Sequence, residues 1–328
     1  MTQTDNTEEE LTKLLTDEKN KFEWSSHVPW KQYKSVLVIG MGGGCDVFSA
    51  YAMKNILSSS FPSIKFFFGN CIGLRDLSKH KKLTECLYQV QVHSEISPNE
   101  NYYTTTILEE SLYKNPNSDS KEDDKERFFE GPYLLLVKHK KLNAKEDKLS
   151  TIEKVTAENT KGLLEAWSHL KVDLIISIDN GGDSLTGGID YVEHVELGRD
   201  KQVKYALESQ TNIDYLYVVM GPGCDGESEK SSLSKGLLDN IQSFLGYFML
   251  TESLVSQLRS CAKFLPPQRT PNIIFDAYNK FQNQDKKTIL LDDLIQIDRG
   301  VKPFIPLRWL ISAWVFSKCK IFAKGTNS

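Results

Sequence analysis

Three apolar segments of this chain each run into a glycine-rich turn that contains acidic residues. Short runs rich in β-branched or aromatic residues, typical of buried strands, occupy residues 35–39, 173–178 and 213–220. The turns that follow them read GMGGGCD (40–46), DNGGD (179–183) and GPGCDGE (221–227). Because the turns after parallel strands emerge at the carboxyl edge of a sheet, this pattern predicts that three segments distant in the chain meet there.

Helices are predicted between the strands, so the two kinds of element alternate along the chain. The apolar patterns predict further strands over 64–68, 86–92 and 133–137, and helices over 47–57, 105–113, 151–170 and 201–209. Alternation of this kind is typical of a parallel sheet that helices bury on both faces. We therefore expect an α/β fold with three layers and a mostly parallel sheet.

The two ends of the chain and one internal segment are expected to depart from this core. Residues 1–33 are predicted to form an N-terminal extension, and residues 34–328 a single α/β domain. The polar and charged segment 115–127 predicts a surface insertion. From about residue 231 the pattern becomes helical, with helices expected over 233–250, 252–264, 272–281 and 307–322 and a short strand over 288–291.

The acids of the three turns are candidate metal ligands. Carboxylates suit hard divalent cations, and we expect Mg²⁺ or Mn²⁺ to be held by Asp46, Asp179, Asp183 and Asp225. A cationic amine or guanidinium group would suit the same charges. The residues expected to bind a small-molecule ligand, partly through backbone N–H groups, are Gly42, Gly43, Gly44, Asp46, Asn180, Gly181, Gly182 and Gly223. Each acid can instead cap a helix or close its own turn.

The first turn also partly matches the dinucleotide-binding pattern GxGxxG. It departs from that pattern at Cys45, where Gly or Ala is usual, and Asp46 then stands at the expected start of a helix. A carboxylate at that place competes with a pyrophosphate for the same N–H groups. No GK(S/T) sequence follows the glycines, so a Walker A loop is absent. Binding of NAD or ATP stays open as an alternative.

Side chains near the same turns are candidates for proton transfer or nucleophilic attack. Glu227 and His194 can exchange protons, although His194 can equally be a surface or packing residue. Cys224 and Cys45 are candidate nucleophiles, but the acid next to each of them raises the pKa of the thiol. The predicted catalytic set is Asp183, Cys224, Asp225, Glu227 and His194.

The three turns resemble, in this order, the domain-of-unknown-function family numbered 1152 (DUF1152). The matching stretches are VLVIGMGGGCDVFSAY (36–51), DLIISIDNGGDSL (173–185) and GPGCDGE (221–227), within a resemblance that covers 35–246. The resemblance implies a Rossmann-like fold and no particular reaction. Family members commonly have glycine at the position of Cys45, which does not support a role for that thiol. The shared site that it implies consists of Asp46, Asp179, Gly181, Gly182, Asp183, Gly223, Cys224, Asp225 and Glu227.

Charge and hydropathy argue against several kinds of partner. With 40 Lys or Arg and 44 Asp or Glu residues, the net charge of −4 does not favour binding to nucleic acid. The longest apolar stretch, 303–323, is interrupted by three cationic residues, and residues 1–21 lack the apolar core of a signal peptide. The six cysteines form no CxxC pair, which indicates free thiols. We expect a cytoplasmic protein without membrane or nucleic-acid partners.

These features together predict an enzyme that acts on a small polar metabolite at an acidic, glycine-rich cleft. Metal-assisted hydrolysis or group transfer is the expected chemistry. Two alternatives stay open, since a fold alone does not define a function. One is an enzyme that binds NAD or ATP, and the other is a non-catalytic ligand sensor or scaffold.

Overall fold

A computed structural model of the protein describes residues 10–97, 102, 104–114, 130–139, 145–188, 197–210, 212–282 and 292–322. Five parallel strands form the centre of its main sheet: β1 (Ser35–Gly40), β2 (Lys65–Ile72), β5 (Tyr133–Leu136), β6 (Leu174–Asn180) and β7 (Asp214–Met220). Antiparallel strands extend both edges: β3 (Lys81–Lys82), β4 (Leu87–Gln89), β8 (Phe244–Met249) and β11 (Ser312–Phe316). The strand order in the described part of the chain is β3-β4-β5-β2-β1-β6-β7-β11-β8.

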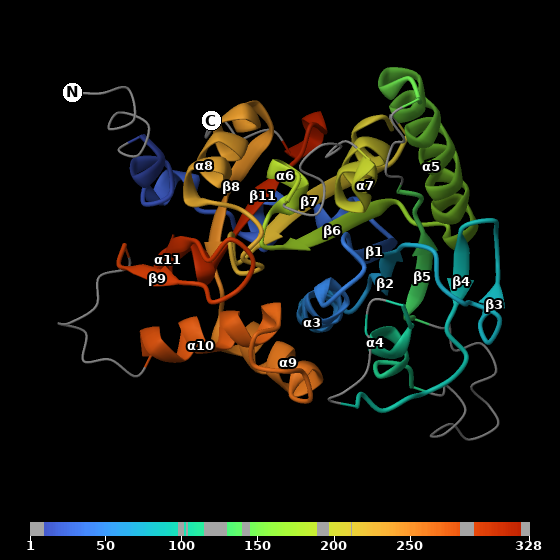
Figure 1. Cartoon of the computed structure of the whole chain (residues 1–328), viewed down its shortest axis with the longest axis horizontal. Coiled ribbons are helices and arrows are strands. Elements are labelled where there is room, and N and C mark those ends of the chain that lie inside the picture. The colour runs from blue at the N-terminus through green and yellow to red at the C-terminus, as the bar shows by residue number, and fades with distance from the viewer. Residues whose placement is uncertain are drawn as a thin grey trace.

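Helices cover both faces of this sheet (Figure 1). On one face α3 (Asp46–Ser60) packs against β1 and β2, and α9 (Glu252–Ala262) packs against α3. On the other face α5 (Lys148–Leu170) packs against α7 (Arg199–Glu208). Burial on both faces agrees with strands such as β1 and β6, in which every residue is buried. The predicted three-layer α/β class with a mostly parallel sheet is confirmed.

The order of the central strands fixes where a ligand site is expected. From β1 the chain moves outward through β2 to β5, and it then returns to the other side of β1 to form β6 and β7. The direction of winding therefore reverses between β1 and β6. In open α/β sheets this reversal leaves a crevice at the carboxyl ends of the two strands, which is where the first two glycine turns emerge.

The remaining elements are short or lie around the sheet. They are α2 (Trp24–His27), α4 (Ile107–Glu110), α6 (Asp183–Thr186), α8 (Lys230–Asp239), α10 (Thr270–Gln282), α11 (Leu307–Leu310), and a small hairpin of β9 (Leu294–Gln296) and β10 (Phe304–Pro306). Residues 10–14 are also helical. The N-terminal segment packs on the body of the molecule, because the Phe22 N–H donates to the Tyr247 carbonyl (2.6 Å) and Trp30 stacks on Phe61.

Two of the predicted C-terminal helices are wrong. The helix expected over 233–250 ends at Asp239, and the chain then forms strand β8. The helix expected over 307–322 is the single turn α11 followed by strand β11, which lies between β7 and β8. Both strands are continuous apolar runs, FLGYFM and SAWVF, and a continuous run fits a buried strand as well as a buried helix. The predicted helices over 252–264 and 272–281 correspond to α9 and α10.

Two further predictions cannot be compared with the structure. The predicted insertion at 115–127 and the predicted strand at 288–291 lie outside the described residues. Within the described part of the chain, no helix combines the length and the apolar character that a membrane span requires.

Candidate functional site

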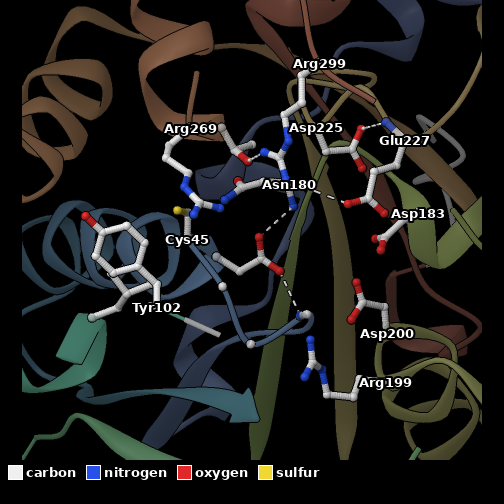
Figure 2. Close-up of a pocket in the computed structure, with 16 residues that line it drawn as sticks. Cys45, Tyr102, Asn180, Asp183, Arg199, Asp200, Asp225, Glu227, Arg269 and Arg299 are labelled. Carbon is white, nitrogen blue, oxygen red and sulfur yellow. Dashed lines mark hydrogen bonds and ion pairs between the residues drawn. The ribbon is translucent and has the colours of Figure 1, made fainter. Parts of the chain in front are cut away.

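The three glycine turns line one cavity of about 100 Å³ at the carboxyl edge of the sheet (Figure 2). The turn after β1 contributes residues 42–46, the turn after β6 contributes Asn180 and Asp183, and the turn after β7 contributes Asp225 and Glu227. Four other segments contribute described residues to the lining that the sequence did not suggest: Tyr102, Leu108, Arg199, Asp200, Arg269, Thr270 and Arg299. The expected meeting of the three turns is therefore present in the structure.

Asp46 connects the first turn to the second. One carboxylate oxygen of this buried residue accepts the N–H of Gly42 (2.8 Å), and the other accepts the N–H of Asn180 (3.3 Å). Burial raises the pKa of Asp46 well above its ordinary value, and the nearby carboxylates of Asp200 and Asp179 raise it further. Because Asp46 occupies the Gly42 N–H, that donor is not available to a phosphate.

Asp179 shapes the second turn from behind the cavity. It is fully buried at the end of β6, and its carboxylate accepts the N–H of Gly182 (3.2 Å) and both the N–H (3.1 Å) and the hydroxyl of Ser184. These bonds cap the first turn of α6. Burial, followed by the charge of Asp200, raises the pKa of Asp179 to about 6.

Asp183, Asp225 and Glu227 form a carboxylate group that faces the cavity. One oxygen from each lies within 4.8 Å of the oxygens from the other two. Asp225 accepts the N–H of Glu227 (3.1 Å), and Glu227 forms a long ion pair with Arg299 (3.8 Å). Burial raises the pKa of both aspartates well above the ordinary value, with Asp200 the next contributor for Asp183 and Glu227 for Asp225. A second group with the same spacing consists of Asp46, Asp179 and Asp200.

Arginine side chains lie around the same cavity. Arg299 donates to the hydroxyl of Thr270 (3.2 Å), and the guanidinium of Arg269 lies over the ring of Tyr102, 5.1 Å from its centre. Figure 2 shows the labelled acids along one side of the cavity and Arg269 with Tyr102 on the opposite side. The cavity therefore has an acidic part and a cationic part.

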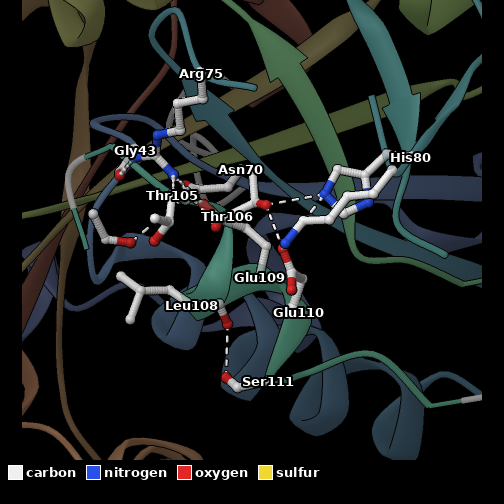
Figure 3. Close-up of polar contacts among 12 residues, drawn as sticks. Gly43, Asn70, Arg75, His80, Thr105, Thr106, Leu108, Glu109, Glu110 and Ser111 are labelled. Carbon is white, nitrogen blue, oxygen red and sulfur yellow. Dashed lines mark hydrogen bonds and ion pairs between the residues drawn. The ribbon is translucent and has the colours of Figure 1, made fainter. Parts of the chain in front are cut away.

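A buried ion pair holds the first glycine turn from outside (Figure 3). Arg75 donates to the carbonyl of Gly43 (2.6 Å) and pairs with Glu109 of α4 (3.3 Å), and the side chains of both residues are at most 1% exposed. Asn70 at the end of β2 donates to the same carboxylate (2.6 Å). Since an Arg–carboxylate pair has a fixed geometry, this arrangement fixes the Gly43 peptide.

The two candidate nucleophiles are in poor positions for attack. Cys224 is fully buried, donates to the carbonyl of Met220 (3.7 Å), and is not among the described residues that line the cavity. Burial raises the pKa of its thiol well above the ordinary value, and Asp225 raises it further. Cys45 does line the cavity, but burial raises the pKa of its thiol to about 12. A thiol that stays protonated is a weak nucleophile.

The other predicted site residues have different positions. Gly181 and Gly182 form the second turn with positive φ angles. Gly223 packs toward Ile305, which leaves it outside the described lining of the cavity. His194 lies outside the described residues.

The fold and the cavity together define a Rossmann-like α/β protein. Its candidate site lies between β1 and β6, where the strand order reverses direction. Residues 134–277 match the family described as "Protein of unknown function (DUF1152)". The resemblance seen in the sequence is thereby confirmed, over a range that includes the second and third turns and leaves out the first. Neither a curated protein nor a solved structure matches the chain significantly.

Proposed function

We propose that the protein is an enzyme that acts on a small polar metabolite by hydrolysis or group transfer, with a divalent cation held by Asp183, Asp225 and Glu227. The observation that carries this proposal is the grouping of these side chains. Carboxylate oxygens from two separate turns lie within 4.8 Å of one another at a cavity wall. An all-oxygen ligand set suits Mg²⁺ or Mn²⁺ rather than a softer metal.

Electrostatics supports a cation at this group. Burial and neighbouring charges raise the pKa of Asp183 and Asp225, which means that their ionised forms lack compensation in the protein alone. A bound cation would supply that compensation and displace the protons. When bound, a divalent ion could lower the pKa of a water molecule or polarise a phosphoryl or carbonyl group.

The sequence also suggested Asp46 and Asp179 as metal ligands, and the geometry gives them another role. Both oxygens of each carboxylate accept hydrogen bonds from backbone N–H groups or from Ser184. We propose that these two residues hold the turns in place. Asp200 belongs to the second carboxylate group and also raises the pKa of Asp183 in the first, so it would tune the charge of both.

The cavity supports this proposal better than the dinucleotide alternative. A GxGxxG turn holds a pyrophosphate through its own N–H groups and those of the following helix. Here Asp46 already accepts one of those N–H groups and adds a negative charge at the start of α3. Those features disfavour a nucleotide phosphate at the first turn.

Titration of the full-length protein with Mn²⁺ tests the proposal. We expect Asp225→Asn to weaken Mn²⁺ binding about tenfold or more, because it removes one ligand charge while its amide oxygen can still accept the Glu227 N–H. The control is Asp239→Asn, an exposed aspartate at the end of α8, which should bind Mn²⁺ like the wild type. Equal affinities in the two variants would contradict the proposal.

A further inference from the structure

We propose that the cavity contains an oxyanion subsite, in which Arg269, Arg299 and Asn180 bind a phosphate or carboxylate group of the substrate. The inference rests on the proposed function, because it names the class of substrate that would occupy the same cavity beside the cation. It is carried by an orphaned hydrogen-bond donor and by the placement of the two arginines, neither of which contributed to the argument for the metal.

The orphaned donor is the side-chain amide of Asn180. Its oxygen accepts the hydroxyl of Ser49 (2.7 Å). Its Nδ2 atom is buried, the residue is 5% exposed, and no acceptor within the described ranges bonds to that nitrogen. A buried donor without an acceptor is unfavourable in free energy, so its presence at a cavity wall points to an acceptor supplied by a ligand.

The arginines place positive charge at the same part of the cavity. Figure 2 shows the side chains of Arg269 and Arg299 directed toward the region of Asn180 and Cys45. Both charges act on Cys45, where they oppose the rise in thiol pKa that burial causes. Contacts with Tyr102 and Thr270 hold the two guanidinium groups at the cavity wall. Guanidinium groups match the planar and tetrahedral oxyanions of carboxylates and phosphates.

The balance of charge in the cavity is compatible with an oxyanion once a divalent cation is bound. Among the described residues, five carboxyl groups and three guanidinium groups line the cavity, so complete ionisation of these leaves two negative charges, which one divalent cation neutralises. With the cation bound at the acidic part, that excess of negative charge no longer opposes an anion beside Arg269 and Arg299. A substrate that carries only positive charge would be repelled by Arg269 and Arg299.

Binding of two simple anions to the full-length protein, with and without saturating Mn²⁺, tests the inference. The probes are inorganic phosphate and acetate, measured by calorimetry. We expect at least one of them to bind the wild type, and we expect Arg269→Gln and Asn180→Asp each to weaken that binding about tenfold or more while Mn²⁺ binding is retained. Arg269 is only partly buried, so its variant keeps the test valid if Asn180→Asp fails to fold.

A control variant and the pattern of Mn²⁺ and anion binding distinguish a failure of the oxyanion subsite from a failure of the metal site. The control is Arg259→Gln, which removes an exposed guanidinium that lies over Phe275 (5.7 Å) outside the cavity and should leave anion binding unchanged. Binding of phosphate alone would support the inference and indicate a phosphorylated substrate. Binding of acetate alone would also support it and would indicate a substrate with a carboxylate. Mn²⁺ binding without either anion, or equal anion affinity in all variants, would overturn the subsite and leave the metal proposal standing. Anion binding without Mn²⁺ binding would overturn the metal proposal instead.

Discussion

At the residue scale, acids that look equivalent in the sequence have different tasks. Both oxygens of Asp46 and of Asp179 accept hydrogen bonds within or between the turns, whereas Asp183, Asp225 and Glu227 bring oxygens within 4.8 Å of one another at the cavity. Each of them stands in or beside a glycine turn, so spacing alone could not separate the two groups. The difference depends on which N–H groups each carboxylate reaches, and that is decided only when the turns fold against one another.

Gly181 offers a direct test at this scale. Its φ of 109° is unfavourable for other residues, and a Cβ atom there would collide with the carboxylate of Asp225. We expect Gly181→Ala to lower the free energy of unfolding by about 1–3 kcal/mol and to weaken Mn²⁺ binding. Gly44→Ala is the matched control, because a Cβ at that position would contact nothing within 4 Å. Unfolding in urea and Mn²⁺ titration of both variants would measure the effects, and similar behaviour of the two would contradict the role of Gly181.

At the element scale, the alternation of strands and helices made the central sheet predictable. The C-terminal part was less predictable, because its continuous apolar runs fit a helix as well as a strand. Strands β8 and β11 replace parts of two predicted helices there. Strand β11 pairs with β7 and β8 pairs with β11, and these long-range contacts leave no local pattern. The ion pair of Arg75 and Glu109 is likewise tertiary, because 34 residues separate its two members.

This ion pair gives a prediction about stability. Glu109→Leu leaves the buried guanidinium of Arg75 without its carboxylate, and we expect the free energy of unfolding to fall by about 3–5 kcal/mol. Because Arg75 also holds the Gly43 carbonyl, binding of inorganic phosphate should weaken as well. Glu85→Leu, which breaks an exposed pair with Lys82, should change the unfolding curve very little. Chemical denaturation of both variants measures the difference, and a similar small change in each would show that the buried pair is not required.

At the scale of the whole molecule, the cavity collects residues that no single motif contains. Asp200 and Arg199 begin α7, Arg269 precedes α10, and Arg299 lies between the strands of the small hairpin. Of these residues, only Arg199 and Asp200 had a local sequence feature that could have pointed to the site, namely two adjacent charges at the start of a helix. The turns of the candidate site were therefore predictable from the sequence, whereas its cationic part depends on how the C-terminal segments pack over the sheet.

Because the clustered acids are buried, we expect the stability of the protein to fall as the pH rises. The pKa of Asp179 is about 6 in the folded protein, against an ordinary value of 3.8, so the folded state binds its proton more tightly than the unfolded state does. The contribution of protonated Asp179 to the free energy of unfolding is complete below about pH 3.8 and is lost as the pH rises through about 6. Without divalent cations, we expect the melting temperature to fall between about pH 5 and pH 7.

Two comparisons check this pH dependence by thermal unfolding. Asp179→Asn should flatten the decrease, whereas Asp76→Asn, at an exposed position, should leave it unchanged. Saturating Mn²⁺ should stabilise the protein more at the higher pH, because fewer protons then have to be displaced. A melting temperature that rises over this range without metal would show that the buried acids do not carry the expected shifts.

The position of a bound cation is the most direct evidence for or against a metal site at Asp183, Asp225 and Glu227. Anomalous scattering from crystals of the full-length protein soaked in Mn²⁺ would locate the ion. We predict a peak at the wall of the cavity, about 2.1 Å from carboxylate oxygens of Asp183, Asp225 and Glu227. A peak elsewhere, or no peak at an Mn²⁺ concentration that saturates the protein in solution, would contradict it.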